Sequence, residues 1–199
     1  GPVGRRLRDG GGAVDERHPL SIGVGGNNMG RVAPNGPLEA LVREADVIVL
    51  AGTRTAQLAT HSWTLYPPTA KFVHIDIDPM EVGRNHEALR LVGDAKATLA
   101  QLASALAGRR AADPQVEQRI RAAREEHAAQ RGWLARSASR PIRPERLMAD
   151  LQTLLTPETI VVGDASFATN WIACFLVALA PGTRFLTPRI VLDRHLGLV

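Results

Sequence analysis

Short runs of β-branched residues alternate along this chain with segments of helical periodicity. Two of the runs, DVIVLAGTR (46–54) and KFVHIDID (71–78), lead into glycine or acidic residues, and a third, LVGD (91–94), does the same. Apolar residues at helical spacing precede the first run, over 35–45, and follow the third, over 94–108. Strands that are buried on both faces and joined through helices form parallel sheets. The pattern therefore predicts an α/β fold with a doubly wound, Rossmann-like parallel sheet.

The same periodicities divide the 199 residues into four parts. Residues 1–17 are rich in glycine and arginine without a period, so we expect an irregular N-terminal segment. The α/β domain covers 18–108, and a basic helix with a linker covers 109–143. The elements expected over 144–199 are too few to cover both faces of a parallel sheet. We therefore expect that this last part is a truncated second α/β domain.

Charge and apolar content limit the kinds of partner that the sequence favours. The formal net charge is +4, and residues 109–146 carry ten arginines against five acidic residues. This segment mixes arginine with glutamate and alanine and holds one aromatic residue, Trp133, so we expect a solvated helix and no nucleic-acid binding. A nucleic-acid binder acting through 109–146 stays a third alternative. The apolar run 171–180 is too short to span a membrane, and we expect it to form a buried helix and no membrane contact.

Polar residues follow each predicted strand of the first domain, where open α/β sheets bind their ligands. An arginine beside glycine amides suits a phosphate, and carboxylates suit ribose hydroxyl groups. We therefore expect a nucleotide site there, although the same residues are also ordinary in caps and turns. The sequence DPME (78–81) predicts a short helix, and His74, inside a strand, is expected to be structural. The candidate nucleotide-binding residues are Gly52, Arg54, Asp76, Asp78 and Asp94.

A second group of small and polar residues follows the predicted strand TIVVGD (159–164) and enters the apolar helix. Groups at a helix N-terminus can bind phosphate, so residues 164–171 form a second candidate, although Asp164 or Ser166 would equally cap the helix. The histidines lack the spacing of zinc ligands, and the sequence has neither a nucleophile elbow nor a Walker loop. The single cysteine, Cys174, suits the core better than a nucleophile, and it fits a reducing, cytoplasmic setting. The residues alone predict no catalytic group and no protein-bound metal.

Several of these segments, in this order, resemble one known family. The segments HPLSIGVGG, EADVIVLAGTR, AKFVHIDIDPMEVGRN and LVGDAKATLAQL are similar to the central domain of thiamine-diphosphate-dependent enzymes. Within that family, the resemblance is to the acetolactate synthase and benzoylformate decarboxylase group. Residues 143–176, together with RFLTPR (184–189), resemble the beginning of the family's C-terminal diphosphate-binding domain. The match extends over about 13–189.

The resemblance implies a set of cofactors and contacts. Complete family members use thiamine diphosphate and Mg²⁺, act on 2-oxo acids, and assemble as homodimers or tetramers. In this chain, Asp164, Ser166, Ala168 and Thr169 fall in the family's first diphosphate-contact loop. The five residues named above for the nucleotide site align with positions that hold FAD in acetolactate synthases, so FAD is one ligand that the resemblance allows in the central domain. Other members bind ADP there, or no nucleotide.

The resemblance also leads us to expect a chain without turnover of its own. The family's catalytic glutamate lies in a pyrimidine-binding domain, and its Mg²⁺ ligands lie in a Gly-Asp-Gly motif with a later asparagine, and neither matches a segment of this sequence. We therefore expect an acetolactate-synthase-like, thiamine-pyrophosphate-binding protein that is a truncated and inactive fragment. The alternative is a non-catalytic α/β module that binds FAD or ADP.

Overall fold

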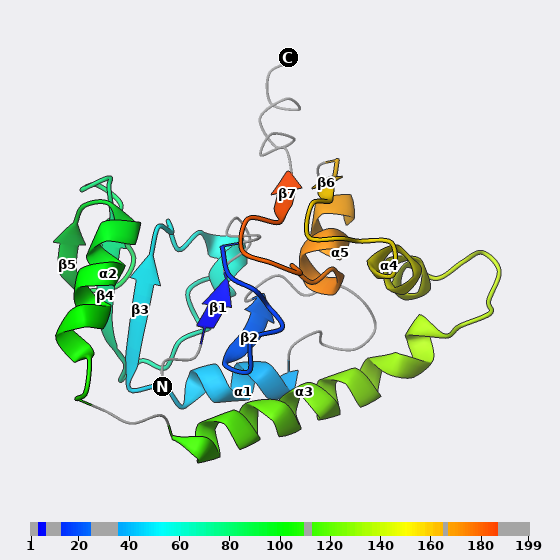
Figure 1. Ribbon diagram of the computed structural model, residues 1–199, viewed down its shortest axis with the longest axis horizontal. Helices are drawn as coiled ribbons and strands as arrows, with labels where there is room; N and C mark the ends of the chain where they lie inside the picture. Colours follow the sequence, from blue (N-terminus) through cyan, green and yellow to red (C-terminus); the bar gives the residue numbers. More distant parts are fainter. Residues whose placement is uncertain (1–3, 7–12, 25–35, 110–112, 165–166, 187–199) are drawn as a thin grey trace.

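The computed structural model describes residues 4–6, 13–24, 36–109, 113–164 and 167–186. Its strands form three parallel sheets, which Figure 1 shows side by side above a long helix. The first pairs β1 (Gly4–Arg6) with β2 (Ser21–Val24). The second contains β3 (Val47–Ala51), β4 (Lys71–Asp76) and β5 (Ala88–Val92), in that order. The third pairs β6 (Ile160–Val162) with β7 (Arg184–Leu186).

Helices connect and cover these sheets. They are α1 (Gly36–Arg43), the 3-10 turn η1 (Gln57–Thr60), α2 (Ala95–Leu106), α3 (Pro114–Ala135), α4 (Pro144–Gln152) and α5 (Phe167–Phe175). The α/β fold with parallel strands is therefore confirmed. α2 begins where the sequence predicted it, because the Asp94 carboxylate accepts a hydrogen bond from the Ala97 amide, 2.8 Å away. None of the described helices is long and apolar enough to cross a bilayer.

The structure differs from the sequence prediction at several element boundaries. The start of the chain is not irregular throughout, because residues 4–6 form β1, which the neighbouring β2 stabilises by parallel pairing. The strand expected over 91–94 lies earlier, at 88–92. The helix expected over 171–180 ends at Phe175, and the chain continues to Pro181 without a helix.

The helix predicted after Asp78 is wrong, because residues 77–86 form turns. The Asp76 carboxylate accepts a hydrogen bond from the Asp78 amide at 3.0 Å, and the Asp78 carboxylate accepts one from the Met80 amide at 2.9 Å. Short acidic side chains that bind the backbone two residues ahead favour turns over helices. Two such turns in succession bend the chain back along the sheet.

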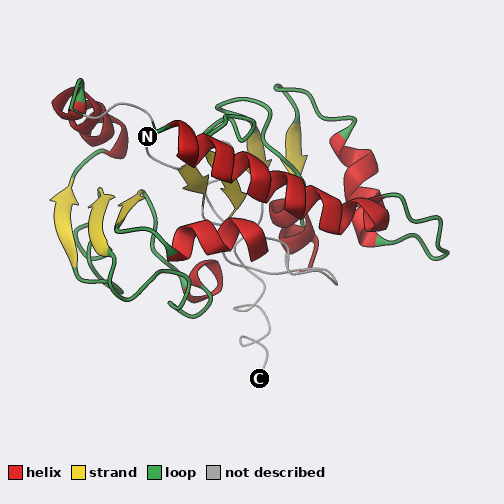
Figure 2. Cartoon of the chain, turned by 90° about the horizontal axis from the view of Figure 1, so that it is seen from below, coloured by secondary structure: helices red, strands yellow, loops and turns green. Residues whose placement is uncertain are grey.

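The helix α3 of the basic segment packs against the core and is not the solvated helix that its charge predicted. Figure 2 shows α3 running beside α1 and on toward the helices of the second half. Ile120 of α3 is 1% exposed and packs with Leu38, Val42 and Leu65 in the main apolar core. The buried residues of this helix are Ile120, Ala123 and Leu134, so a few apolar positions attach a mostly polar helix to the core.

Several arginines of α3 make contacts with other parts of the chain. Arg119 forms an ion pair with Glu44, and Arg124 donates to the backbone carbonyls of Glu16 and His18. The guanidinium of Arg131 lies 3.6 Å from the centre of the Phe175 ring, where burial lowers its pKa to about 10. These three arginines therefore connect α3 to both halves of the chain, Arg119 and Arg124 to the first half and Arg131 to the second.

The two halves are also tied together near the start of the chain. The Glu16 amide donates to the Ala178 carbonyl at 3.2 Å, and the Ala178 amide donates to the Glu16 carboxylate at 3.2 Å. Arg17 donates to the Leu179 carbonyl. A second apolar cluster of Met148, Ile172 and Leu176 then anchors α4 and α5 to each other.

His127 on α3 makes the stability of this arrangement depend on pH. Burial, and then the charge of Arg131, lowers its pKa from 6.5 to about 4, and its Nε2 lies 3.1 Å from Arg131 Nη1. The unfolded chain therefore binds the proton more tightly than the folded chain between these two values. The contribution of neutral His127 to the free energy of unfolding is therefore fully present above pH 6.5, and it is lost as the pH falls toward 4.

We expect the titration of His127 to lower the free energy of unfolding by about 1–2 kcal/mol as the pH falls from about 7.5 to about 4.5. This figure is reduced to allow for its partial exposure. Urea unfolding at the two pH values measures this loss. The matched variant is His127→Gln, which can still accept from Arg131 but does not titrate. Equal losses in the variant and the parent chain would show that His127 does not carry the effect.

Candidate functional site at the carboxyl edge of the central sheet

The ends of β3, β4 and β5 meet at one edge of the central sheet. Ala51, Ile75 and Leu91 lie opposite one another in register, so the residues that follow them are neighbours. The Gly52 amide donates to the Ile75 carbonyl at 2.8 Å, and the Gly93 amide donates to the Asp76 carbonyl at 2.9 Å. The structure therefore brings the chain segments of all five predicted nucleotide-site residues to the same edge.

Gly52 turns the chain away from this edge. Its φ of +60° lies in the left-handed region that glycine adopts without steric penalty, and a side chain there would be strained. The turn carries Arg54 outward, with its side chain 56% exposed. The guanidinium is therefore open to a ligand from solvent.

Each of the three aspartates is held by one carboxylate oxygen. Asp76 and Asp78 accept backbone amides in the turns already described, and Asp94 caps α2 through Oδ1. These bonds fix the carboxylates in place and leave the second oxygen of each one to accept from a ligand hydroxyl. The arrangement fits a nucleotide, with an exposed guanidinium for phosphate and oriented carboxylates for the sugar.

His74 organises the loops behind this edge. It is 1% exposed, and its Nδ1 accepts a hydrogen bond from the Gly83 amide at 3.0 Å. The proton is then on Nε2, which lies 2.9 Å from the Thr53 carbonyl and donates to it. His74 thereby links β4 to the loop that carries Arg54 and to the turn after Asp78, which agrees with the structural role expected for it.

Thr55 holds the most unusual backbone at this site. Its φ is +48°, which is costly for a β-branched residue, and its side chain is buried. Asn85 Nδ2 donates to Thr55 Oγ1 at 2.9 Å, and the Trp63 indole donates to the Thr55 carbonyl at 2.9 Å. Strained residues persist where their surroundings hold them, and they are common at ligand sites.

Sequence reasoning missed Asn85, which is 30 residues from Thr55 in the chain, and Trp63, which reaches Thr55 through a turn. Asn85 also donates to the Arg54 carbonyl at 3.2 Å, so it fixes both ends of the Arg54–Thr55 peptide segment. The indole of Trp63 is 43% exposed although its N–H is bound, which leaves part of the ring open beside the site. Residues 61–63 all have a left-handed backbone conformation, and no residue type in the sequence predicted it.

The second predicted site fits a cofactor less well. The Thr169 hydroxyl is buried and donates to the Asp164 carbonyl at 2.7 Å, while Ala168 offers no polar side chain. Ser166 lies outside the described residues. The Thr169 hydroxyl is therefore already used within the chain and does not donate to a diphosphate.

A metal site and a reactive cysteine are the two other kinds of site to consider in the described part of the chain. Among the residues that the structure describes, no three His, Cys, Asp or Glu side chains gather as metal ligands would. Cys174 lies on α5 as predicted, but it is half-buried and not fully in the core.

Comparison with known proteins places these features in one family. Residues 3–102 match the family described as "Thiamine pyrophosphate enzyme, central domain". A "Probable acetolactate synthase large subunit" from Methanocaldococcus jannaschii is 32% identical over 190 residues, which cover 85% of this chain and 29% of that protein. An "Acetolactate synthase" from Mycobacterium avium is 35% identical over 96 residues, covering 48% of this chain and 15% of the relative.

A third relative carries a different activity in its name. The "3D-(3,5/4)-trihydroxycyclohexane-1,2-dione hydrolase" from Listeria monocytogenes is 42% identical over 84 residues, which cover 41% of this chain and 13% of that protein. This chain thus spans less than a third of the length of each of these relatives. The chain belongs to the thiamine pyrophosphate enzyme family and carries that family's central domain in its first half.

Proposed function

We propose that this chain binds a nucleotide, FAD or ADP, at the carboxyl edge of β3, β4 and β5. The observation that carries the proposal is the exposed guanidinium of Arg54 beside carboxylates that are fixed by one oxygen each. FAD and ADP share the adenosine diphosphate unit, so one site of this kind serves both. The flavin of FAD would extend beyond the contacts described here.

We further propose that the chain is part of an acetolactate-synthase-like enzyme. The support is the family match and the names of two of the relatives. Such an enzyme decarboxylates a 2-oxo acid and joins the product to an acceptor. Thiamine diphosphate, anchored through Mg²⁺, supplies the carbanion chemistry when it is bound. We also propose a homodimer or tetramer in the cytoplasm, on the same basis.

A second candidate function is a nucleotide-binding module without catalysis. The internal hydrogen bond of Thr169 favours it, because that hydroxyl is not available to a diphosphate. The two functions differ in one binding result. A chain that retains ADP or FAD but not thiamine diphosphate acts as the module, and a chain that retains both acts as part of the enzyme.

Arg54→Gln tests the nucleotide site. Removing one charge-assisted contact to phosphate weakens binding by about 2 kcal/mol, or about thirtyfold in the dissociation constant. Equilibrium dialysis of the 199-residue chain against labelled ADP measures the change. Arg121→Gln, which removes an exposed arginine of α3, is the matched control. Equal ADP affinity in the two variants would remove Arg54 from the site.

A further inference from the structure

The turn after β4 holds a buried carboxylate between two arginines that face solvent. Glu81 is 8% exposed, and its Oε1 accepts a hydrogen bond from Arg84 Nη1 at 3.2 Å. The same oxygen lies 3.8 Å from Arg54 Nε, an ion pair between positions 27 residues apart in the chain. Both arginine side chains are more than half exposed, at 56% for Arg54 and 62% for Arg84. Glu81 is therefore inside the molecule, while the two guanidinium groups that it pairs with are at the surface.

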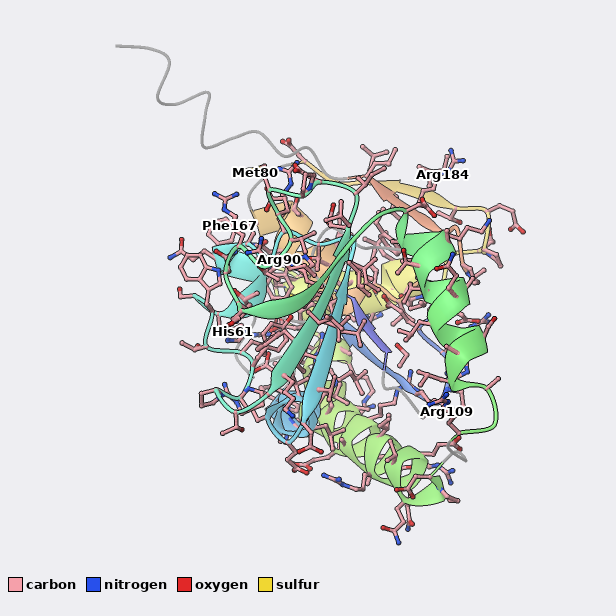
Figure 3. All side chains as sticks on the ribbon, turned by 90° about the vertical axis from the view of Figure 1, so that its left-hand side faces the viewer. His61, Met80, Arg90, Arg109, Phe167 and Arg184 are labelled. Carbon is pink, nitrogen blue, oxygen red and sulfur yellow. The ribbon has the colours of Figure 1, made fainter. Side chains whose placement is uncertain are left out.

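A third arginine approaches the same turn. A side-chain carbon placed on Gly83 would lie 2.8 Å from Arg90 Nε, so the guanidinium of Arg90 packs against the bare backbone of this glycine. Figure 3 shows Arg90 on the central sheet and Met80 above it, at the end of the sheet where the turn begins. Three guanidinium groups therefore lie at this turn, and two of them, Arg54 and Arg84, pair with the same carboxylate.

The pairing at Glu81 is incomplete. Its second oxygen, Oε2, is buried and has no hydrogen-bond partner within the described part of the chain. Arg54 is close enough for an ion pair but too far for a hydrogen bond. A buried carboxylate oxygen without a donor costs free energy, so it favours any movement that brings the Arg54 fork onto it.

We propose that Glu81 is a positioning residue that holds Arg54 and Arg84 as a clamp for the diphosphate of a nucleotide. This inference rests on the nucleotide site proposed above and adds Arg84 and Glu81 to it. Each guanidinium uses one edge for Glu81 and keeps the other for a phosphoryl oxygen. Two such groups side by side match the two adjacent charged groups of a diphosphate. Adenosine, which has none, is bound without the clamp.

Inorganic pyrophosphate tests the clamp without the rest of the nucleotide. Calorimetric titration of the 199-residue chain is expected to show pyrophosphate binding that Arg84→Gln weakens about tenfold. Arg84→Lys keeps the charge but loses the fork, so it restores only part of the affinity. Arg121→Gln on α3 is again the matched control, and melting curves establish that each variant is folded.

Glu81→Gln distinguishes positioning from charge by the sign of its effect. Removing a negative charge from the cluster would strengthen anion binding if Glu81 acted by charge alone. A positioning role predicts the opposite, which is pyrophosphate binding weakened about tenfold, because the guanidinium groups lose their fixed orientation. Unchanged or tighter binding by Glu81→Gln, or no pyrophosphate binding by the parent chain, would overturn the proposal.

Failure of the clamp and failure of the nucleotide site give different results. If ADP binds and its advantage over adenosine survives in both Arg84→Gln and Glu81→Gln, the clamp is wrong and the nucleotide site stands. If pyrophosphate binds as expected but neither ADP nor FAD does, the nucleotide proposal is wrong and the clamp belongs to another diphosphate or polyphosphate.

Discussion

Replacing His74 with leucine is expected to lower the free energy of unfolding by about 3–4 kcal/mol. The ring satisfies two groups from different loops, the Thr53 carbonyl and the Gly83 amide, and leucine leaves both unpaired in a buried setting. An unpaired buried polar group costs about 1–3 kcal/mol. Urea denaturation measures the loss, and a matched change on the same strand, Lys71→Leu at an exposed position, gives the background.

The same substitution is expected to weaken ADP binding, because His74 fixes the loop that carries Arg54. His74→Gln offers one donor and one acceptor, so it should recover part of both the stability and the binding. A leucine variant as stable as the Lys71→Leu control would show that the two hydrogen bonds contribute little. A destabilised variant with unchanged ADP affinity would separate His74 from the site.

The second large effect is expected from Ile120→Ala, at a loss of about 3 kcal/mol in the free energy of unfolding. Ile120 is 1% exposed, and its side chain joins α3 to the core residues Leu38 and Val42 of α1. Truncation removes apolar contact and leaves a cavity between two helices that cannot close freely. Gln118→Ala, exposed on the same helix, is the matched control.

This prediction distinguishes a helix α3 that is packed in the core from a solvated linker helix. A solvated linker helix would lose less than about 1 kcal/mol on the same change, as exposed positions do. A value near that of Gln118→Ala would therefore restore the interpretation that the charge of this segment first suggested.

The sequence predicted those strands and helix starts whose own residues have a characteristic pattern. The β-branched runs at 46–54 and 71–78 became β3 and β4, and the cap of α2 at Asp94 is the one that the residue type indicated. Strand ends in a parallel sheet converge by topology, which is why the residues of the nucleotide site could be grouped before their positions were known.

The remaining features depend on contacts between distant residues. β1 has the sequence GRR, with no strand pattern, and it forms by pairing with β2. The core role of Ile120 is hidden in a helix that is mostly arginine, glutamate and alanine. The ion pair of Arg54 with Glu81 joins two loops, so no local sequence pattern predicts it.

Titration of the ¹⁵N-labelled chain with ADP, followed by amide chemical shifts, tests the central claim most directly. A nucleotide site at the carboxyl edge predicts saturable shifts of the amides at 52–54, 76–78 and 93–94. If saturating ADP and FAD move none of the three segments, or move only residues 164–170, the nucleotide site is not at this edge and the account is wrong.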